Sequence, residues 1–173
     1  MFFVTLVIGG LVTADWLWRS IEMSALVERV EASEYVMVTY QANVSDAFDD
    51  HAEDPVTLEE DLQELSKQAA DDLAQVASPI ADQPIALWHS DIERARQAYL
   101  LHNKAWQAYM VRASSSAEEL LLPQEEVDST FLQAEQPLRD AVPIPDAAKL
   151  MDRIDAIFAP PAVEEEPGST LST

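Results

Sequence analysis

The sequence predicts an all-α protein: an N-terminal transmembrane helix that continues into a long stalk helix, an antiparallel helical bundle, short C-terminal helices and an acidic, proline-rich tail. Three observations support this prediction. Only 3 of the 173 residues are glycine, while Ala, Leu, Glu and Gln are frequent, and this composition favours helices over tight β-turns. The chain opens on a long apolar run. Beyond that run, apolar residues recur at spacings of three and four, the pattern of an amphipathic helix.

The composition excludes several classes of function. The net charge is −22, so the body of the protein is expected to repel nucleic-acid phosphates and anionic lipid head groups. The chain contains no cysteine, which rules out disulfides and every metal site that needs a thiolate. Hydrophobic residues make up 48% of the chain, enough for one modest helical core.

The opening stretch, MFFVTLVIGGLVTADWLWRSIEM, predicts a transmembrane anchor over residues 1–19. It carries no charged side chain before Asp15. A helix through Trp18 would be about 27 Å long, close to the roughly 30 Å of a hydrocarbon core. Trp16 and Trp18 are then expected at the far membrane interface. A cleaved signal peptide is the alternative, but the basic segment that begins such peptides is missing.

This anchor predicts a single-pass protein of the cytoplasmic membrane with an extracytoplasmic body, since the layout is that of a signal sequence. The arginines Arg19 and Arg29 follow the span, and a strict positive-inside count would instead favour a cytoplasmic body. Small residues recur every four positions at Thr5, Gly9 and Thr13, and Gly10 begins an adjacent row. Such faces let another helix approach closely in lipid, which predicts docking to an integral membrane protein complex.

A heptad stripe extends the first helix beyond the membrane to about Asp50. Its members alternate at spacings of three and four: Met23, Leu26, Val30, Ser33, Met37, Tyr40, Val44 and Ala47. The next predicted helix is about 30 Å long, too short to run back along the whole stalk. We therefore expect Met23, Leu26 and Val30 to lack an internal cover and to bind the partner. The stalk and bundle together are predicted to span residues 20–114.

Two capping boxes predict the starts of the next helices. Thr57 and Glu60 mark the start of a helix over 58–77, and Ser90 and Glu93 mark the start of a helix over 91–113. A proline-bounded connector separates these two helices.

Prolines divide residues 115–159 into loops and short helices. The clearest helix lies in PIPDAAKLMDRIDAIF, where apolar residues recur at helical spacing. The acidic tail over 160–173 contains too little apolar surface to fold alone.

No catalytic, cofactor-binding or metal site is expected, and an enzyme is not predicted. The acidic cluster Asp46–Asp54 has a composition that suits a hard cation, but it lacks the spacing of an EF-hand loop. His102 lies in an apolar stripe and is expected to be a hydrogen-bonded core residue rather than a ligand. His89 has no companion at a metal-binding spacing.

The layout resembles a known type of protein. An apolar anchor (MFFVTLVIGGLVTADWLW) leads into a helix (RSIEMSALVERVEASEYVM), an acidic Ala-rich helical body and an acidic tail (APPAVEEEPGST). This architecture is similar to that of the single-span accessory subunits of the actinobacterial cytochrome bcc–aa3 respiratory supercomplex. The resemblance implies a role in an electron-transport assembly and covers the whole chain, but it has no diagnostic motif, so it assigns no residue.

The sequence thus predicts a non-catalytic, membrane-anchored accessory or scaffold subunit that binds a larger membrane complex and the lipid bilayer. The alternative is a cell-envelope module that binds a ligand or metal on a membrane stalk. A helical enzyme whose site has no recognisable motif is a third class.

Overall fold

Residues 2–159 fold into five α-helices and two 3₁₀ turns, which confirms the all-α prediction. The computed structural model describes the backbone of residues 2–159 and the side chains of this range except those of 2–12 and 145. The elements are α1 (Phe2–Asp50), α2 (Pro55–Ala81), α3 (Ser90–Ala113), η1 (Ala117–Leu121), α4 (Glu125–Asp140), η2 (Ile144–Asp146) and α5 (Ala147–Ile157).

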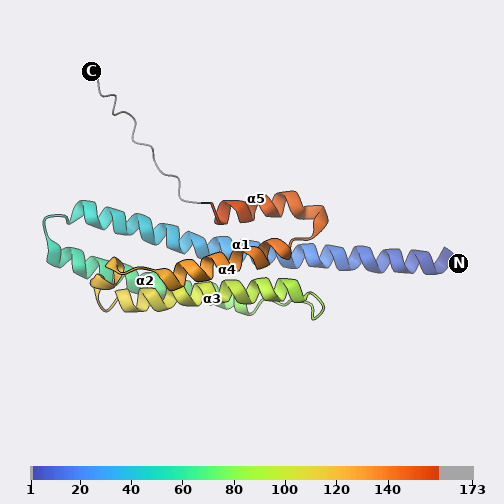
Figure 1. Ribbon diagram of the computed structural model, residues 1–173, viewed down its shortest axis with the longest axis horizontal. Helices are drawn as coiled ribbons and strands as arrows, with labels where there is room; N and C mark the ends of the chain where they lie inside the picture. The colour runs from blue at the N-terminus through green and yellow to red at the C-terminus, as the bar shows by residue number, and fades with distance from the viewer. Residues whose placement is uncertain (1, 160–173) are drawn as a thin grey trace, which may run out of the picture.

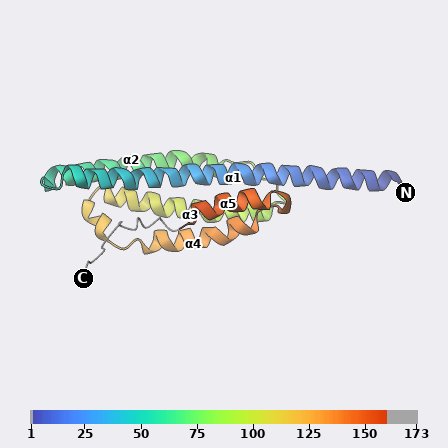
Figure 2. The same ribbon diagram turned by 90° about the horizontal axis from the view of Figure 1, so that it is seen from above.

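Consecutive helices run antiparallel along one long axis (Figure 1). α1 and α2 form a hairpin, α3 packs on α2, and α4 packs on α3. α5 then returns to lie against both α1 and α4, and the first turns of α1 extend beyond all other helices (Figure 2). Within the described residues α1 does not pack along α4. The bundle is therefore closed on that side only where α5 bridges the two helices.

The first helix ends at Asp50, as predicted, because no proline or glycine interrupts the chain between Leu11 and Asp54. The second begins at Pro55, three residues before the predicted start. Asp54 is its N-cap: the Asp54 carboxylate accepts hydrogen bonds from the Thr57 backbone N–H at 3.3 Å and from the Thr57 hydroxyl at 2.8 Å. A proline fits the first helical position, where its missing N–H costs nothing. The predicted capping box of Thr57 and Glu60 is wrong for this reason.

Two prolines lie inside helices, and for Pro79 this differs from the prediction, which places it in the connector after the second helix. α2 continues through Pro79 to Ala81, and α4 continues through Pro137 to Asp140. Ile80 and Leu138 directly follow these prolines, and both side chains are fully buried. Burial of a large aliphatic side chain contributes about 1.5–3 kcal/mol, which offsets much of the cost of one proline near a helix end. α3 begins at Ser90, one residue before the predicted start, and His89 precedes it without a side-chain cap.

Two groups of buried side chains form the interior. The first core surrounds the middle of α1 and contains Met23, Leu26, Val27, Val30, Ile80, Ile92, Ala95, Tyr99, Ala134, Leu138, Ala141, Leu150 and Ile154. The second core lies towards the α1–α2 turn and contains Met37, Tyr40, Ala69, Ala70, Leu73, Ala105, Tyr109, Met110 and Val127.

A polar layer separates the two cores along α1 and α3. The Tyr99 hydroxyl donates to Glu34 Oε1 at 2.7 Å, and Asn103 Nδ2 donates to Ser33 Oγ at 2.8 Å. His102 Nδ1 lies 3.2 Å from Thr130 Oγ1 of α4. Hence His102 is a hydrogen-bonded core residue, as predicted. Because buried polar groups are costly when unpaired, this layer fixes the register of α1, α3 and α4.

The polar layer predicts a loss of stability in alkaline solution. Burial, reinforced by the charge of Glu34, raises the pKa of Tyr99 well above the ordinary value of 10.0. The folded phenol therefore stays protonated where the unfolded phenol ionises, so the free energy of unfolding must fall as the pH rises above about 10. We expect Tyr99→Phe to make this fall shallower in urea titrations between pH 8 and 11. The exposed Tyr35→Phe is the control, and an equal change in both variants would contradict the assignment.

The membrane prediction is not supported. In the part of the chain that the structure describes, no helix combines the length and apolar character that a membrane span requires. The predicted single-pass localisation is therefore wrong. Trp18, expected at a membrane interface, packs edge-to-face on Trp88, with ring centroids 6.4 Å apart. Asp15 and Arg19 contact residues of the bundle rather than head groups.

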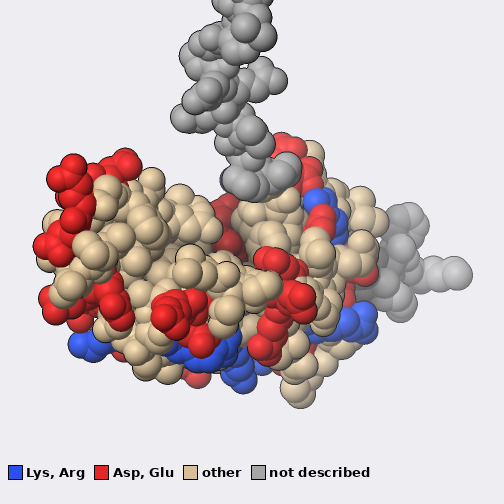
Figure 3. Space-filling model, turned by 60° about the vertical axis from the view of Figure 1, so that its left-hand side comes forward, with Lys and Arg blue, Asp and Glu red and all other residues tan. Residues whose placement is uncertain are grey.

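Acidic side chains dominate the surface. Figure 3 shows many Asp and Glu side chains and few Lys and Arg side chains on the face that includes the α1–α2 turn. The counts over the whole chain are 32 acidic and 10 basic residues. Any partner of this surface is therefore expected to be basic or apolar rather than acidic.

Candidate partner-binding site

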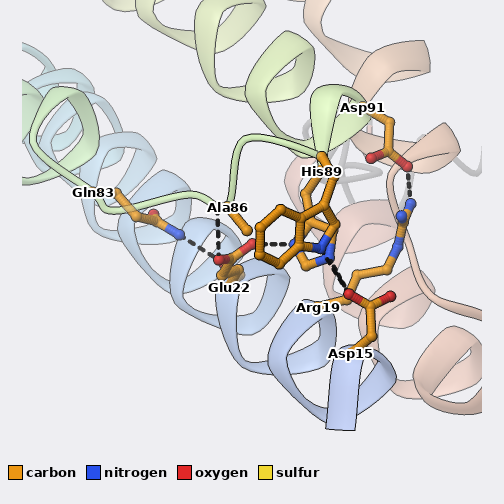
Figure 4. A network of polar contacts seen from close by, with 8 residues as sticks. Asp15, Arg19, Glu22, Gln83, Ala86, His89 and Asp91 are labelled. Carbon is orange, nitrogen blue, oxygen red and sulfur yellow. Dashed lines mark hydrogen bonds and ion pairs between the residues drawn. The ribbon is translucent and has the colours of Figure 1, made fainter. Parts of the chain in front are cut away.

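A connector between α2 and α3 is attached to one side of α1. Gln83, which is buried, donates from Nε2 to the Glu22 backbone carbonyl at 2.7 Å. Three residues later the Ala86 backbone N–H donates to Glu22 Oε1 at 2.9 Å. The connector thus uses both the backbone and the carboxylate of one α1 residue as its attachment point (Figure 4).

His89 completes this attachment at the end of the connector. Its side chain is 1% exposed, and that of Glu22 is 5% exposed. His89 Nδ1 lies 2.6 Å from Glu22 Oε2, and His89 Nε2 lies 3.3 Å from Asp15 Oδ1. Both ring nitrogens of His89 are therefore occupied by carboxylates of α1, and the ring is held in one orientation.

Asp15 connects this buried pair to the surface. It accepts a hydrogen bond from Trp88 Nε1 at 2.7 Å. That hydrogen bond is the main cause that lowers the pKa of Asp15 below its ordinary value of 3.8, with a further contribution from His89. One turn along α1, Arg19 forms an ion pair with Asp91 in the first turn of α3 (Figure 4). Both ends of the connector and the start of α3 are thereby fixed to α1.

The same attachment presents apolar side chains to the outside. Leu87 is 97% exposed and Trp88 is 65% exposed. Beside them on α1, Leu17, Trp18 and Ile21 are also more than half exposed. We call these five residues, Leu17, Trp18, Ile21, Leu87 and Trp88, the tryptophan patch. Large exposed apolar side chains that cluster in this way are typical of protein contact sites.

One cluster contains side chains of the kinds used in acid–base catalysis: Asp15, Glu22 and His89. A bound molecule could not reach the ring nitrogens of its histidine. Both ring nitrogens of His89 face carboxylates of the same chain, and the ring is almost wholly buried. A general base must lie within hydrogen-bond reach of the proton that it removes from a bound molecule. In this structure the cluster positions the connector and leaves no ring nitrogen for a substrate.

The site residues predicted from the sequence lie elsewhere. Met23, Leu26 and Val30 are fully buried in the first core, so the expectation that a partner covers them is wrong. α2 is longer than expected and reaches back to this level, and α5 also covers it. The side chains of Thr5, Gly9 and Gly10 lie outside the described part, and Thr13 is exposed.

Sequence reasoning missed Glu22, His89 and Trp88. One signal was present: Glu22 is a charged residue between Ile21 and Met23 in an otherwise apolar stretch of the heptad pattern. A carboxylate at such a position requires a partner once it is buried. The sequence could not show that this partner comes from 67 residues further along the chain.

The acidic cluster at the α1–α2 turn forms an open hollow of about 290 Å³, lined by residues of both helices. In it, His51 Nε2 lies 3.0 Å from Asp61 Oδ2. Among the described residues, no three His, Asp or Glu side chains are grouped so that they could hold a metal ion. This region therefore adds no support to the alternative of a metal-binding module.

No protein-family model matches the chain, and neither a curated protein nor a solved structure is similar to it. The resemblance to accessory subunits of a respiratory supercomplex therefore stays a prediction.

Proposed function

We propose that this protein is a non-catalytic helical docking subunit that binds a larger protein assembly through the tryptophan patch. The observation that carries the proposal is the contrast within one connector. Leu87 and Trp88 are largely exposed, while the adjacent His89 is buried, with Nδ1 2.6 Å from the Glu22 carboxylate.

This contrast is informative because burying a polar side chain is costly unless it is hydrogen-bonded. The chain supplies these hydrogen bonds: Glu22 accepts from the Ala86 backbone N–H, and the ring nitrogens of His89 lie against the carboxylates of Glu22 and Asp15. The result is a connector with a fixed conformation, although its apolar side chains contribute little to the core.

A fixed display of tryptophan favours binding. Tryptophan is enriched among the residues that dominate protein interfaces, and a surface that is already ordered loses less entropy on association. The edge-to-face contact between Trp18 and Trp88 further restricts both rings. The patch lies at the base of the projecting turns of α1, whose sequence carries no charged side chain from Met1 to Ala14. The sequence without charged side chains, Met1 to Ala14, thus precedes the α1 residues of the patch.

The test substitutes one patch residue that makes no polar contact. Leu87→Asp introduces a charge into the patch, and at 97% exposure its cost to folding should stay within about 0.5 kcal/mol. We expect the tagged variant, purified from the native cell, to lose the proteins that co-purify in stoichiometric amount with the wild-type chain.

Leu132→Asp is the matched control, because Leu132 is a leucine of α4 that is 67% exposed and lies outside the patch. It adds the same charge and should retain the partner. If both variants retain the partner, the patch is not the contact surface. If both lose it, the loss reflects added charge, and the proposal also fails.

A further inference from the structure

We propose a second binding surface, independent of the tryptophan patch. It is the open seam between α1 and α4, the groove that these two helices leave beyond the C-terminal end of α5. This seam binds an amphipathic helix of a partner protein, and that helix carries arginine or lysine beside its apolar stripe.

α5 shows what this seam accepts, because it occupies the other half of the same seam. Its side chains Leu150 and Ile154 are buried in the first core. Arg153 on the same helix forms a bidentate ion pair with Glu31 of α1: Nε donates to Oε1 at 2.7 Å and Nη2 donates to Oε2 at 2.6 Å. The bound helix therefore inserts apolar residues and presents arginine to an acidic α1.

The two walls continue where α5 stops. α5 ends at Ile157, and the ring of Phe158 packs on Phe131 of α4, with centroids 4.5 Å apart. From Val38 to Asp50, α1 extends for about 20 Å more, and α4 begins six residues before Phe131. Figure 3 shows that the molecule is hollowed on the face turned towards the α1–α2 end.

A row of rings forms the floor of this open half. Phe131 lies 5.0 Å from His102, His102 lies 6.4 Å from Trp106, and Trp106 lies 5.8 Å from Tyr109, measured between ring centroids. Phe131 and Trp106 are only half-buried. His102 Nε2 is buried, lies 3.6 Å from Glu34 Oε1 and makes no hydrogen bond within the described residues. An apolar floor with half-exposed rings is suited to the apolar stripe of a helix.

Apolar side chains also occur on the α1 wall. Val38 and Phe48 are 61% and 47% exposed. At 100° per residue both lie within about 40° of Glu34 around the helix, the residue that contacts His102 and Tyr99. The wall that faces the seam therefore carries two exposed apolar residues where α5 no longer covers it.

Charge decides which occupant fits. The α4 wall begins with Glu125, Glu126 and Asp128, which are all exposed, and Glu34 lies on the α1 wall. The following segment of the chain, 160–173, has three glutamates and no lysine or arginine. A second copy carries a net charge of −22. Both would be repelled by acidic walls, whereas a basic amphipathic helix would complement them, as Arg153 does within the chain.

The probe is a fluorescently labelled, 14-residue helical peptide with leucine at the i, i+3, i+4 and i+7 positions and arginine at its flanks. Binding to the full chain is measured by fluorescence anisotropy in 150 mM salt. We expect Val38→Lys to weaken binding by at least about tenfold, because it places a positive charge on the apolar part of the α1 wall, where it repels the arginines of the peptide. Val56→Lys makes the same substitution at a valine of α2 that is 67% exposed and lies outside the seam, and it should weaken binding by less than about twofold.

A scrambled peptide of identical composition distinguishes seam binding from attraction to the net charge. Equal binding of the scrambled peptide, or equal effects of the two lysine variants, would overturn the proposal. A photo-crosslinker at Val38 identifies the occupant directly. Crosslinks to a second copy or to residues 160–173 that persist with saturating peptide would also overturn it. Because Leu87→Asp leaves the seam intact, that variant should bind the peptide normally, so this test is separate from that of the tryptophan patch.

Discussion

Replacement of Glu22 by alanine is expected to destabilise the protein by about 2–3 kcal/mol or more, the cost of leaving buried hydrogen-bonding groups without a partner. The substitution leaves His89 buried without its nearest carboxylate, which lies 2.6 Å away in the intact chain. It also removes the acceptor of the Ala86 backbone N–H. The measurement is urea unfolding followed by circular dichroism, in which the midpoint should fall while its slope is retained.

Glu28→Ala is the control for this change, because Glu28 lies on the same helix but is exposed. Its expected effect is within about 0.5 kcal/mol. A loss below about 1 kcal/mol for Glu22→Ala would mean that the pair contributes little more than a surface ion pair. The attachment of the connector would then need another explanation.

The same variant bears on the proposed function. If the Glu22 carboxylate fixes the connector through Ala86 and His89, Glu22→Ala should loosen Trp88 even under conditions where the chain remains folded. The edge-to-face contact between Trp18 and Trp88 would then be lost. The aromatic signal in near-ultraviolet circular dichroism should weaken, and partner binding should fall as it does for Leu87→Asp.

Much of the fold could be predicted from local pattern. α3 and the part of α1 after Gly10 have apolar residues at helical spacing and no internal proline or glycine, and the C-terminal end of α1 and both ends of α3 fall within one residue of expectation. The errors occur where packing overrides local preference. The pattern places Pro79 in a connector, yet the segment is helical to Ala81 and the following Ile80 is buried.

The candidate site was not predictable because it depends on contacts between distant segments. Neither the buried pair of Glu22 and His89 nor the hydrogen bond from Trp88 to Asp15 follows from periodicity. Hydropathy alone predicts a membrane anchor for the apolar opening stretch, and it places Trp16 and Trp18 at the membrane interface. In the folded chain Trp18 instead belongs to a surface that the connector helps to build.

The heptad stripe of α1 gives the second large prediction. Leu26 lies in the first core with no exposed surface, and Met37 lies in the second core with 4% exposed. Each is expected to cost about 2–5 kcal/mol when truncated to alanine, from lost apolar burial and the cavity that remains. The prediction from helix length differs. It expects the second helix to be too short to cover Leu26, so only Met37→Ala would destabilise the chain.

Comparing the two variants in the full chain therefore tests whether the bundle covers α1 along its whole stripe. Ile21→Ala is the control: Ile21 is 69% exposed and belongs to the tryptophan patch, so its truncation should change the free energy of unfolding by less than about 0.5 kcal/mol. Leu26 and Met37 belong to different cores, and the polar layer lies between them. The two losses of stability should therefore add in the double variant to within about 0.5 kcal/mol. A Leu26→Ala variant as stable as the wild type would show that the first core is not formed by this chain alone. In that case the apolar face of α1 around Leu26 would be exposed in the isolated chain. This face, rather than the tryptophan patch, would then be the expected docking surface.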